Sequence, residues 1–225
     1  MFVGREHELD VMRRLYDRRG FEMIVLYGRR RIGKTSLIEE FVKDKRVLFF
    51  TALQQSDLLN LRGFSAAIAE FYGQPSETPP FATWQQAFDY ITKRERESST
   101  PMVLVFDEFP YAALANTSLP SVLQIAIDHD LKRTNVMLVL SGSNEGFMES
   151  KVLGAKSPLF GRRTAQIRLQ PLSYLEVAKF LPNTPPIEQV DYYATFGGTP
   201  YYLSQLDESA GYQSNVINLC FDKLG

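Results

Sequence analysis

Cysteine and histidine are scarce in this sequence: among 225 residues there are one cysteine, Cys220, and two histidines. A single cysteine excludes a disulfide within the chain, and so few sulfur and imidazole ligands leave little for a zinc site. We therefore expect any bound metal to have oxygen ligands. Long apolar runs are missing too, since none approaches the about 20 residues of a membrane helix, and the N-terminus "MFVGREHELD" has no apolar signal-peptide core. These absences predict a soluble, cytoplasmic protein without a membrane partner.

A strong excess of charge is also missing. The chain has 25 basic and 26 acidic residues and a net charge of −1, which argues against a nucleic-acid protein that binds by bulk electrostatics. The charge is nevertheless uneven, because residues 1–46 contain 12 basic and 8 acidic side chains. The basic excess therefore surrounds one loop of this first segment, described below.

Five short apolar segments predict the strands of a sheet, and helical patterns separate them. The expected strands cover residues 22–27, 46–53, 101–109, 135–143 and 164–172, and the expected helices residues 5–18, 34–42, 57–73, 81–96 and 119–132. Apolar residues at helical spacing, such as Leu58, Leu61 and Phe64, mark the helix faces that pack on the sheet. Strands that alternate with helices indicate an α/β fold with a doubly wound, mostly parallel sheet. The weaker, alternating last segment is expected near a sheet edge.

The pattern changes near residue 172, and we place a domain boundary there. Residues 1–172 are expected to form the main domain, and residues 173–225, with short helices broken by "LPNTPP" and "GGTP", a small helical subdomain. The final segment "SNVINLCFDKLG" resembles a helix that is cut off in mid-course. We therefore expect the sequence to be a fragment of a longer protein.

The segment between the first strand and the next helix, "GRRRIGKT", fits the pattern G-x-x-x-x-G-K-[ST]. Its glycines let the backbone curl so that N–H groups point at a phosphate, and the helix that follows adds its positive N-terminus. Lys34 can reach the β- and γ-phosphates, and the Thr35 hydroxyl can bind Mg²⁺. The residues predicted to hold a nucleotide are Gly28, Arg29, Arg30, Arg31, Ile32, Gly33, Lys34, Thr35 and Ser36. The alternative is a basic turn without a ligand.

The three arginines of this segment have a separate expected role. The phosphate loop needs only backbone N–H groups from Arg29, Arg30 and Arg31, so their side chains are free to point outward. We expect them to meet neighbouring acids, a partner subunit or a nucleic acid.

Two carboxylates close the third expected strand, "VLVFDEF". A phosphate loop predicts such a strand, in which Asp107 positions Mg²⁺ and Glu108 orients and polarises the attacking water as a general base. The fourth strand ends in "LSGSN", where Ser141, Ser143 and Asn144 are candidates for contact with the γ-phosphate or the water. The alternatives are solvated acids at a strand end and a plain turn.

In order and spacing, six segments resemble the P-loop ATPases of the AAA+/STAND group, and closely the archaeal-type ATPase family that also occurs in bacteria. They are "FVGREHEL", "YGRRRIGKTSL", "VFDEFPY", "LSGSN", "SPLFGRRT" and "GGTPYYL". The resemblance implies a P-loop NTPase sheet with a C-terminal helical lid, and ATP with Mg²⁺ as cofactors. It also implies that Val3, Gly4 and Arg5 lie along the adenine and ribose.

The resemblance implies roles for three more residues. Arg162 or Arg163 lies where related ATPases have an arginine finger, which often reaches across a subunit interface of a homo-oligomer. Pro200 is similar to the lid proline that packs near the nucleotide base. Surface salt bridges would equally explain the arginines, and a helix start would explain Pro200. A second arginine sensor is not evident in the lid, which leaves lid-coupled hydrolysis open.

The function predicted from these residues is a Mg²⁺-dependent ATPase that acts as a nucleotide-driven conformational or assembly switch. Three alternatives stay open: a nucleotide-holding regulatory scaffold that does not hydrolyse, a P-loop kinase, and a DNA-associated ATPase similar to origin-recognition initiators. The family usually continues into further domains after the lid, and a DNA or protein partner is expected to bind there.

Overall fold

The computed structural model of the chain describes residues 2–75 and 77–222. Its centre is a five-stranded sheet in the order β2-β3-β4-β1-β5, and every strand pair is parallel. The strands are β1 (Glu22–Tyr27), β2 (Val47–Thr51), β3 (Met102–Asp107), β4 (Val136–Gly142) and β5 (Ala165–Arg168). The predicted α/β fold is therefore confirmed, and the expected edge strand, β5, does lie at an edge.

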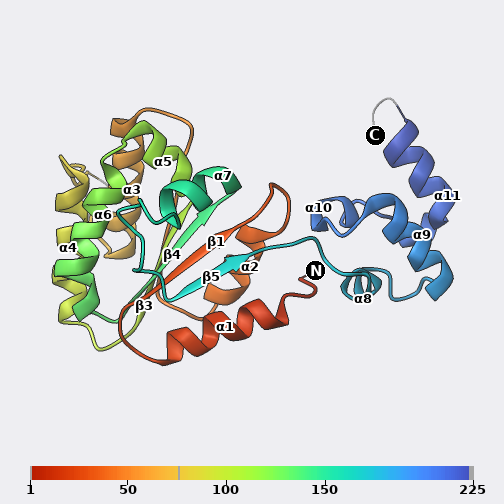
Figure 1. Ribbon diagram of the computed structural model, residues 1–225, viewed down its shortest axis with the longest axis horizontal. Helices are drawn as coiled ribbons and strands as arrows, with labels where there is room; N and C mark the ends of the chain where they lie inside the picture. The colour runs from red at the N-terminus through yellow and green to blue at the C-terminus, as the bar shows by residue number, and fades with distance from the viewer. Residues whose placement is uncertain (1, 76, 223–225) are drawn as a thin grey trace.

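Helices follow the strands along the chain (Figure 1). The α-helices are α1 (Glu6–Asp17), α2 (Lys34–Val42), α3 (Asp57–Phe71), α4 (Trp84–Arg96), α5 (Phe109–Ala115), α6 (Leu119–His129), α7 (Glu145–Phe147), α8 (Tyr174–Val177), α9 (Pro186–Phe196), α10 (Pro200–Leu203) and α11 (Gly211–Val216). Single 3₁₀ or π turns cover Leu131–Arg133, Met148–Val152, Ala178–Phe180, Glu208–Ala210 and Ile217–Phe221. No helix within residues 2–75 and 77–222 is both long and apolar enough to cross a membrane.

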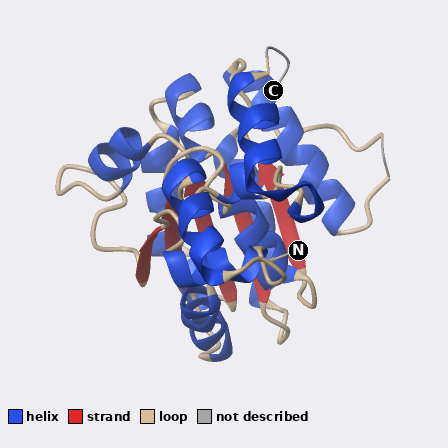
Figure 2. Ribbon diagram, turned by 90° about the vertical axis from the view of Figure 1, so that its right-hand side faces the viewer, coloured by secondary structure: helices blue, strands red, loops and turns tan. Residues whose placement is uncertain are grey.

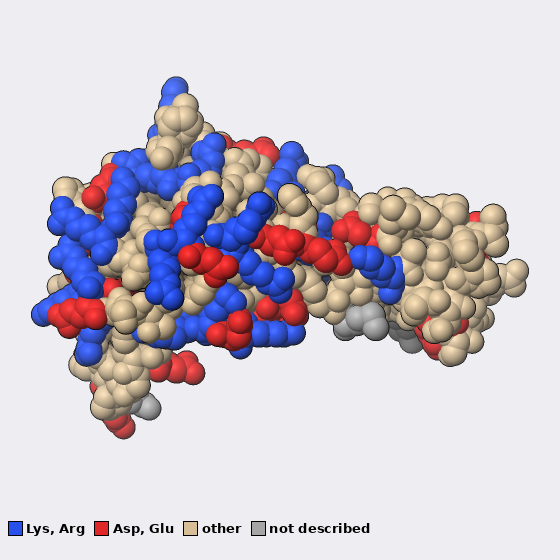
Figure 3. Space-filling view, turned by 90° about the horizontal axis from the view of Figure 1, so that it is seen from below, with Lys and Arg blue, Asp and Glu red and all other residues tan. Residues whose placement is uncertain are grey.

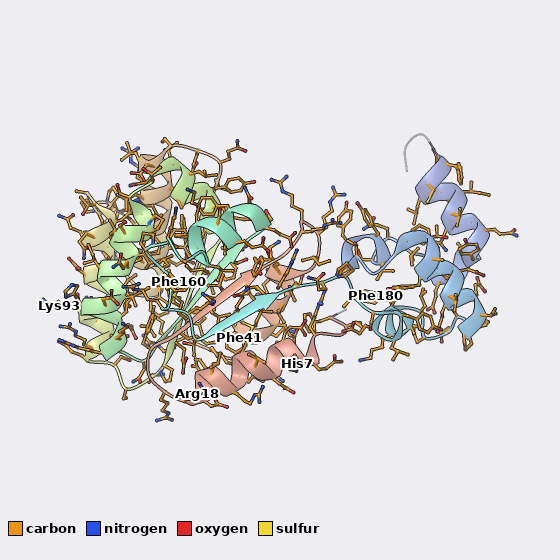
Figure 4. All side chains as sticks on the ribbon, in the orientation of Figure 1. His7, Arg18, Phe41, Lys93, Phe160 and Phe180 are labelled. Carbon is orange, nitrogen blue, oxygen red and sulfur yellow. The ribbon has the colours of Figure 1, made fainter. Side chains whose placement is uncertain are left out.

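Two apolar layers cover the sheet because successive strand residues point to opposite faces. In β1, Met23 and Val25 belong to the cluster formed with α3, α4, α5 and α6, whereas Ile24 and Leu26 belong to the cluster formed with α1 and α2. Phe41 of α2 lies between this second face and α1 (Figure 4). Strands buried on both faces explain why their sequences are continuously apolar rather than alternating.

One predicted core residue is wrong. Leu58 was expected on the buried face of α3, but it is 56% exposed. In α3 burial begins only at Asn60, whose side-chain amide bonds to the backbone of Leu53. The first turn of α3 therefore lies beyond the apolar cluster. The short helices α5 and α7 were not expected either, since neither is long enough to show a helical period.

The C-terminal helices α8 to α11 lie to one side of the sheet and form a helical lid (Figures 1 and 2). They have a small apolar cluster of their own, in which Leu172, Val177 and Leu203 are buried. Where the chain passes from the sheet into these helices, the backbone N–H of Leu172 donates a hydrogen bond of 2.7 Å to the Gly198 carbonyl. The boundary near residue 172 stays a prediction. Residues 223–225 of the segment expected to be an interrupted helix lie outside the described residues.

Candidate functional site

The loop after β1 curls back over the end of its own strand. Gly28 has φ 153°, and a side chain there would meet the Leu169 carbonyl oxygen at 2.6 Å. Gly33 has φ 91° and is the residue before α2. Arg31 adopts φ 66°, a left-handed conformation that normally favours glycine. These three residues let the loop reverse direction within the span between β1 and the N-terminus of α2.

Lys34 points into the concave side of this loop. It is 6% exposed, and its Nζ donates to the carbonyls of Gly28 and Arg29 at 3.0 and 3.1 Å. Burial lowers the pKa of the Lys34 ammonium, and the charges of Glu108 and Asp107 oppose that shift. A buried ammonium group that is hydrogen-bonded to neutral carbonyl oxygens still needs a compensating negative charge. The loop is therefore suited to bind an anionic group beside Lys34.

The next side chain links the loop to β3. The Thr35 hydroxyl donates to Oδ2 of Asp107 at 3.2 Å, and Asp107 is 4% exposed. A hydroxyl and a carboxylate at this distance are ligands suited to Mg²⁺, which usually keeps water and substrate phosphates as its other ligands. Among the residues that the structure describes, no group of three or more His, Cys, Asp or Glu side chains could hold a metal alone. The Thr35 hydroxyl and the Asp107 carboxylate therefore fit a metal ion that binds together with a phosphate group.

Glu108 is held in place from two sides. Its backbone is left-handed, with φ 48°, and its N–H donates to Oδ1 of Asp107 at 3.0 Å. Its Oε2 accepts from the N–H and the hydroxyl of Ser143, at 3.1 and 2.9 Å. Strained backbone of this kind persists only where the surroundings impose it. Ser143 at the end of β4 thus fixes the carboxylate that follows β3.

Among the described residues, the other polar side chains at the end of β4 make no hydrogen bond to Glu108. The Asn144 side chain accepts from Phe147 N–H at 3.0 Å and so begins α7. The Ser141 hydroxyl is buried and has no hydrogen-bond partner among the described residues. Ser143 is therefore the residue of "LSGSN" that contacts an expected catalytic group.

A cavity of about 490 Å³ opens above the loop, which is within the usual size of small-molecule sites. The loop and α2 contribute Arg30, Arg31, Ile32, Gly33, Lys34, Thr35 and Ser36 to its lining, and Glu108 and Tyr111 follow from β3 and α5. The N-terminus contributes Phe2, Val3 and Arg5, and the lid contributes Phe180, Pro200, Tyr201 and Ser204. Figure 4 shows Phe180 on the lid side of this region. Four segments far apart in the sequence thus enclose one space.

The N-terminal residues expected along the nucleotide base have different surroundings. Val3 lines the cavity, whereas Gly4 is not part of its lining and lies against Leu172 and Glu176. Arg5 is 6% exposed and donates to the carbonyls of Ile32 and Gln170, at 3.3 and 2.6 Å. Arg5 therefore ties the phosphate loop to the segment that leads into the lid.

The loop arginines contact aromatic rings. Arg30 Nη2 donates to the Tyr111 hydroxyl at 2.6 Å, and the Arg31 guanidinium lies 4.2 Å from the centre of the Tyr201 ring. The described residues provide no acidic partner for Arg29, Arg30 or Arg31, so the first of the three expected contacts, with neighbouring acids, is wrong, while contact with a partner subunit or a nucleic acid stays a prediction. The reason is local: the loop faces α5 and α10, which present tyrosines there.

The two candidate finger arginines differ from each other. Arg162 pairs with Asp128 of α6, through Nε at 3.1 Å to both carboxylate oxygens and also through Nη2. Arg163 is half-buried and has no ion pair within residues 2–75 and 77–222. Neither arginine lines the cavity, so neither is placed to contact a nucleotide held by the same chain.

Sequence reasoning missed several cavity residues: Phe2, Tyr111, Phe180, Tyr201 and Ser204. Tyr111 and Tyr201 stand next to predicted segments, in "FPY" and "TPYY", and aromatic residues beside a site motif are the signal that could have found them. Phe180 and Ser204 follow no recognisable motif. Only the folding of the lid toward the loop brings them to the site.

Comparisons with known proteins agree with this geometry. The model of an ATPase domain predominantly from Archaea matches residues 2–206. A relative from Methanocaldococcus jannaschii, "Uncharacterized protein MJECL04", is 32% identical over 206 residues, which are 92% of this chain and 44% of that protein. The chain thus spans less than half the length of this curated relative.

Solved structures show the same fold. The Walker-type ATPase PABY2304 of Pyrococcus abyssi matches with a TM-score of 0.65 at 18% identity, covering 90% of this chain and 65% of that one. The ORC2 protein of Aeropyrum pernix, in ADPNP–ADP complexes, matches with a TM-score of 0.68 at 14% identity, covering 97% and 68%. Because the family model covers most of the residues that build the sheet, the loop and the cavity, the chain belongs to the family of ATPase domains found predominantly in Archaea.

Proposed function

We propose that this chain binds and hydrolyses ATP with Mg²⁺ and that the bound nucleotide controls the position of the lid. The observation that carries the proposal is the single cavity that Lys34, Thr35 and Glu108 share with Pro200 and Tyr201. A nucleotide in this space would contact the sheet through its phosphates and the lid through its other end. Its presence would therefore favour one arrangement of the two parts, as a switch requires.

The loop residues supply the binding chemistry in this proposal. Lys34 exchanges its two carbonyl contacts for phosphate oxygens, and the N-terminus of α2 adds its positive dipole. Thr35 and Asp107 would hold Mg²⁺, which supplies charge neutralisation between the phosphates when it is bound. The phosphate loop does not read the base, so selection of ATP over GTP would come from Phe2, Val3 and Pro200.

Glu108 and Ser143 supply the hydrolytic chemistry. The Glu108 carboxylate would accept a proton from the attacking water, and Ser143 holds that carboxylate through two hydrogen bonds. A group held in this way needs little reorganisation before reaction. Adjacent Asp107 and Glu108 favour hydrolysis over transfer to a second substrate, which is the kinase alternative.

Assembly into a homo-oligomer is part of the proposal. Arg163 would act as the arginine finger for a neighbouring copy, because Arg162 is already bound to Asp128. On the face seen in Figure 3, many Lys and Arg side chains lie among Asp and Glu side chains over the sheet, while most of the lid surface there is uncharged. Binding of a DNA or protein partner is part of the proposal as well.

Substitution of Glu108 tests the function. Purified protein with Glu108→Gln should bind ATP within a few-fold of the unsubstituted affinity and release phosphate at least about a hundredfold more slowly, as expected for loss of a general base. Lys34→Ala should lose ATP binding. Glu97→Gln, an exposed position at the end of α4, is the control and should keep full activity.

The outcomes separate the alternatives. Turnover that survives Glu108→Gln would show that the assigned base is wrong. ATP binding without any turnover of the unsubstituted protein would favour the regulatory scaffold. Phosphate release that requires an added acceptor would favour the kinase, and competition between ATP and GTP in the same assay measures base selection.

A further inference from the structure

Arg30 occupies a position that no other arginine of the chain shares. It lines the 490 Å³ cavity above the phosphate loop, and it also lines a smaller adjoining hollow of about 130 Å³. Glu108 and Tyr111 line both spaces as well, and Ser143 lines the smaller one. Arg30 and Glu108, the carboxylate that would activate water, thus border the same two spaces.

No carboxylate of residues 2–75 or 77–222 neutralises the charge of Arg30. Its one hydrogen bond goes from Nη2 to the Tyr111 hydroxyl at 2.6 Å, and no carboxylate in the described ranges pairs with it. A guanidinium without a carboxylate partner beside a phosphate loop can donate strong, charge-assisted hydrogen bonds to a phosphoryl group.

The other arginines near the site are engaged or point elsewhere. Arg31 stacks on Tyr201 of the lid, and Arg162 pairs with Asp128 on α6. Arg5 is buried against backbone carbonyls, and Arg29 lines neither space. Arg30 is therefore the arginine that the fold leaves available to the reacting phosphate of its own chain.

We propose that Arg30 is a catalytic residue that stabilises the transition state of hydrolysis from within the same chain, and that Tyr111 is its positioning residue. The inference rests on the proposed function. In the step concerned, the water oxygen bonds to the γ-phosphorus while the bond from that phosphorus to the bridging oxygen breaks. The water proton passes to Glu108, and the electron pair leaves with the diphosphate. Arg30 offsets the negative charge that spreads over the phosphoryl oxygens.

This assignment refines the role expected for the loop arginines. The ground-state phosphates are held by Lys34 and the backbone, so Arg30 contributes little to ATP affinity and much to the rate. An arginine supplied to such a transition state raises kcat by about 10³ to 10⁵ in enzymes that use one. Arg30 therefore supplies this charge from within its own chain, in addition to the finger that Arg163 would contribute to a neighbouring copy.

The test compares three substitutions by phosphate release and by binding of ADP with Mg²⁺ and tetrafluoroaluminate, which imitates the transferred phosphoryl group. Arg30→Ala should lower kcat at least about a hundredfold with KM within a few-fold. It should also lose the extra thermal stabilisation that tetrafluoroaluminate adds over ADP alone, while ADP affinity persists. Arg30→Lys should be intermediate, because lysine retains charge without the planar fork. Arg133→Ala, an exposed charge removal on the turn before β4, controls for net charge.

Either of two kinetic results would overturn the assignment. One is a kcat of Arg30→Ala within threefold of the unsubstituted protein. The other is an equal loss in Arg133→Ala, the exposed control for net charge. Tyr111→Phe should lower kcat severalfold and weaken the tetrafluoroaluminate complex with KM unchanged; an effect on KM alone would show that Tyr111 does not position Arg30.

Mixing two inactive variants tests whether Arg30 acts in the site of its own chain or in the site of a neighbouring copy. Arg30→Ala and Glu108→Gln proteins, mixed in equal amounts, should stay inactive because each site needs both residues from one chain. Recovery of activity in the mixture would place Arg30 in the site of a neighbour and overturn the proposal. If the unsubstituted protein releases no phosphate, the proposed function fails. The role of Arg30 is refuted separately if Arg30→Ala keeps the extra thermal stabilisation that tetrafluoroaluminate adds over ADP alone.

Discussion

Single residues of the phosphate loop combine backbone strain with side-chain contacts. Arg31 has φ 66°, which costs a residue with a Cβ about 1 kcal/mol, yet its guanidinium stacks on Tyr201 at 4.2 Å. The left-handed backbone and the contact with the lid occur at the same residue. Arg31 therefore links the conformation of the loop to the position of α10.

Substitution of Arg31 should separate these two contributions. Arg31→Ala loses the ring contact and keeps the strain, so the free energy of unfolding should fall by about 0.5 to 1 kcal/mol. Arg31→Gly loses the same contact but relieves the strain, so it should be about 1 kcal/mol more stable than Arg31→Ala. Urea denaturation of the two variants measures the difference.

Arg19 provides the matched control. It also has a left-handed backbone, with φ 51°, and is exposed without an aromatic partner among the described residues. Arg19→Ala should therefore be nearly neutral, while Arg19→Gly should show the same gain over alanine as at position 31. Equal effects of alanine at the two positions would mean that the Tyr201 contact adds no stability.

At the scale of elements, an ion pair joins α6 to the segment before β5. Arg162 and Lys132 hold the pKa of Asp128 at about 2, well below its ordinary value of 3.8. A carboxylate whose pKa is lower in the folded protein stabilises the fold above the unfolded pKa, and this stability is lost as the pH falls toward the folded pKa. The loss should therefore occur between about pH 4 and pH 2.

Asp128→Asn measures this contribution. The variant should be less stable than the unsubstituted protein by at most about 2 kcal/mol at pH 7, and by less in practice because the pair is partly open to water. The difference should fall to about half at pH 3. Asp10→Asn, which removes an exposed contact 3.7 Å long to Arg13, is the control and should change stability by less than about 0.5 kcal/mol. A difference that does not vary with pH would contradict the assigned cause.

At the scale of the whole molecule, the sheet and the lid differ in the amount of apolar core they contain. The sheet has two large buried clusters, whereas the lid has one small cluster centred on Leu172, Val177 and Leu203. Regions with few buried apolar contacts open at lower free energy. The lid is therefore the part of the chain whose amides should exchange with solvent first.

Nucleotide binding should change that exchange. With ATP and Mg²⁺ at about 100 times the dissociation constant, linkage allows stabilisation of up to about 2.7 kcal/mol. Hydrogen exchange should therefore slow in α10 and the Ala178–Phe180 turn, both of which contribute cavity residues. Lys34→Ala should show no such change. Slowing confined to the loop and α2 would separate nucleotide binding from the lid and argue against a switch.

Much of the fold could be predicted because its signals are local. The continuous apolar runs at residues 22–27, 101–109 and 135–143 became β1, β3 and β4, since strands buried on both faces need no polar alternation. The loop between β1 and α2 was likewise predicted from Gly28, Gly33, Lys34 and Thr35, and its binding of phosphate stays a prediction. Leu58 was misassigned because helical spacing does not report where a helix extends past the sheet it covers.

The sequence by itself determined the chemistry that this chain offers: a glycine loop with a lysine, a hydroxyl after it, and two acids at the end of a strand. These features depend on residue type and spacing along the chain, which folding does not alter. Only the tertiary structure decided how they combine. It placed Tyr201 over Arg31, Tyr111 on Arg30 and Ser143 on Glu108, because such contacts join residues that are distant in sequence and depend on the docking of separate elements.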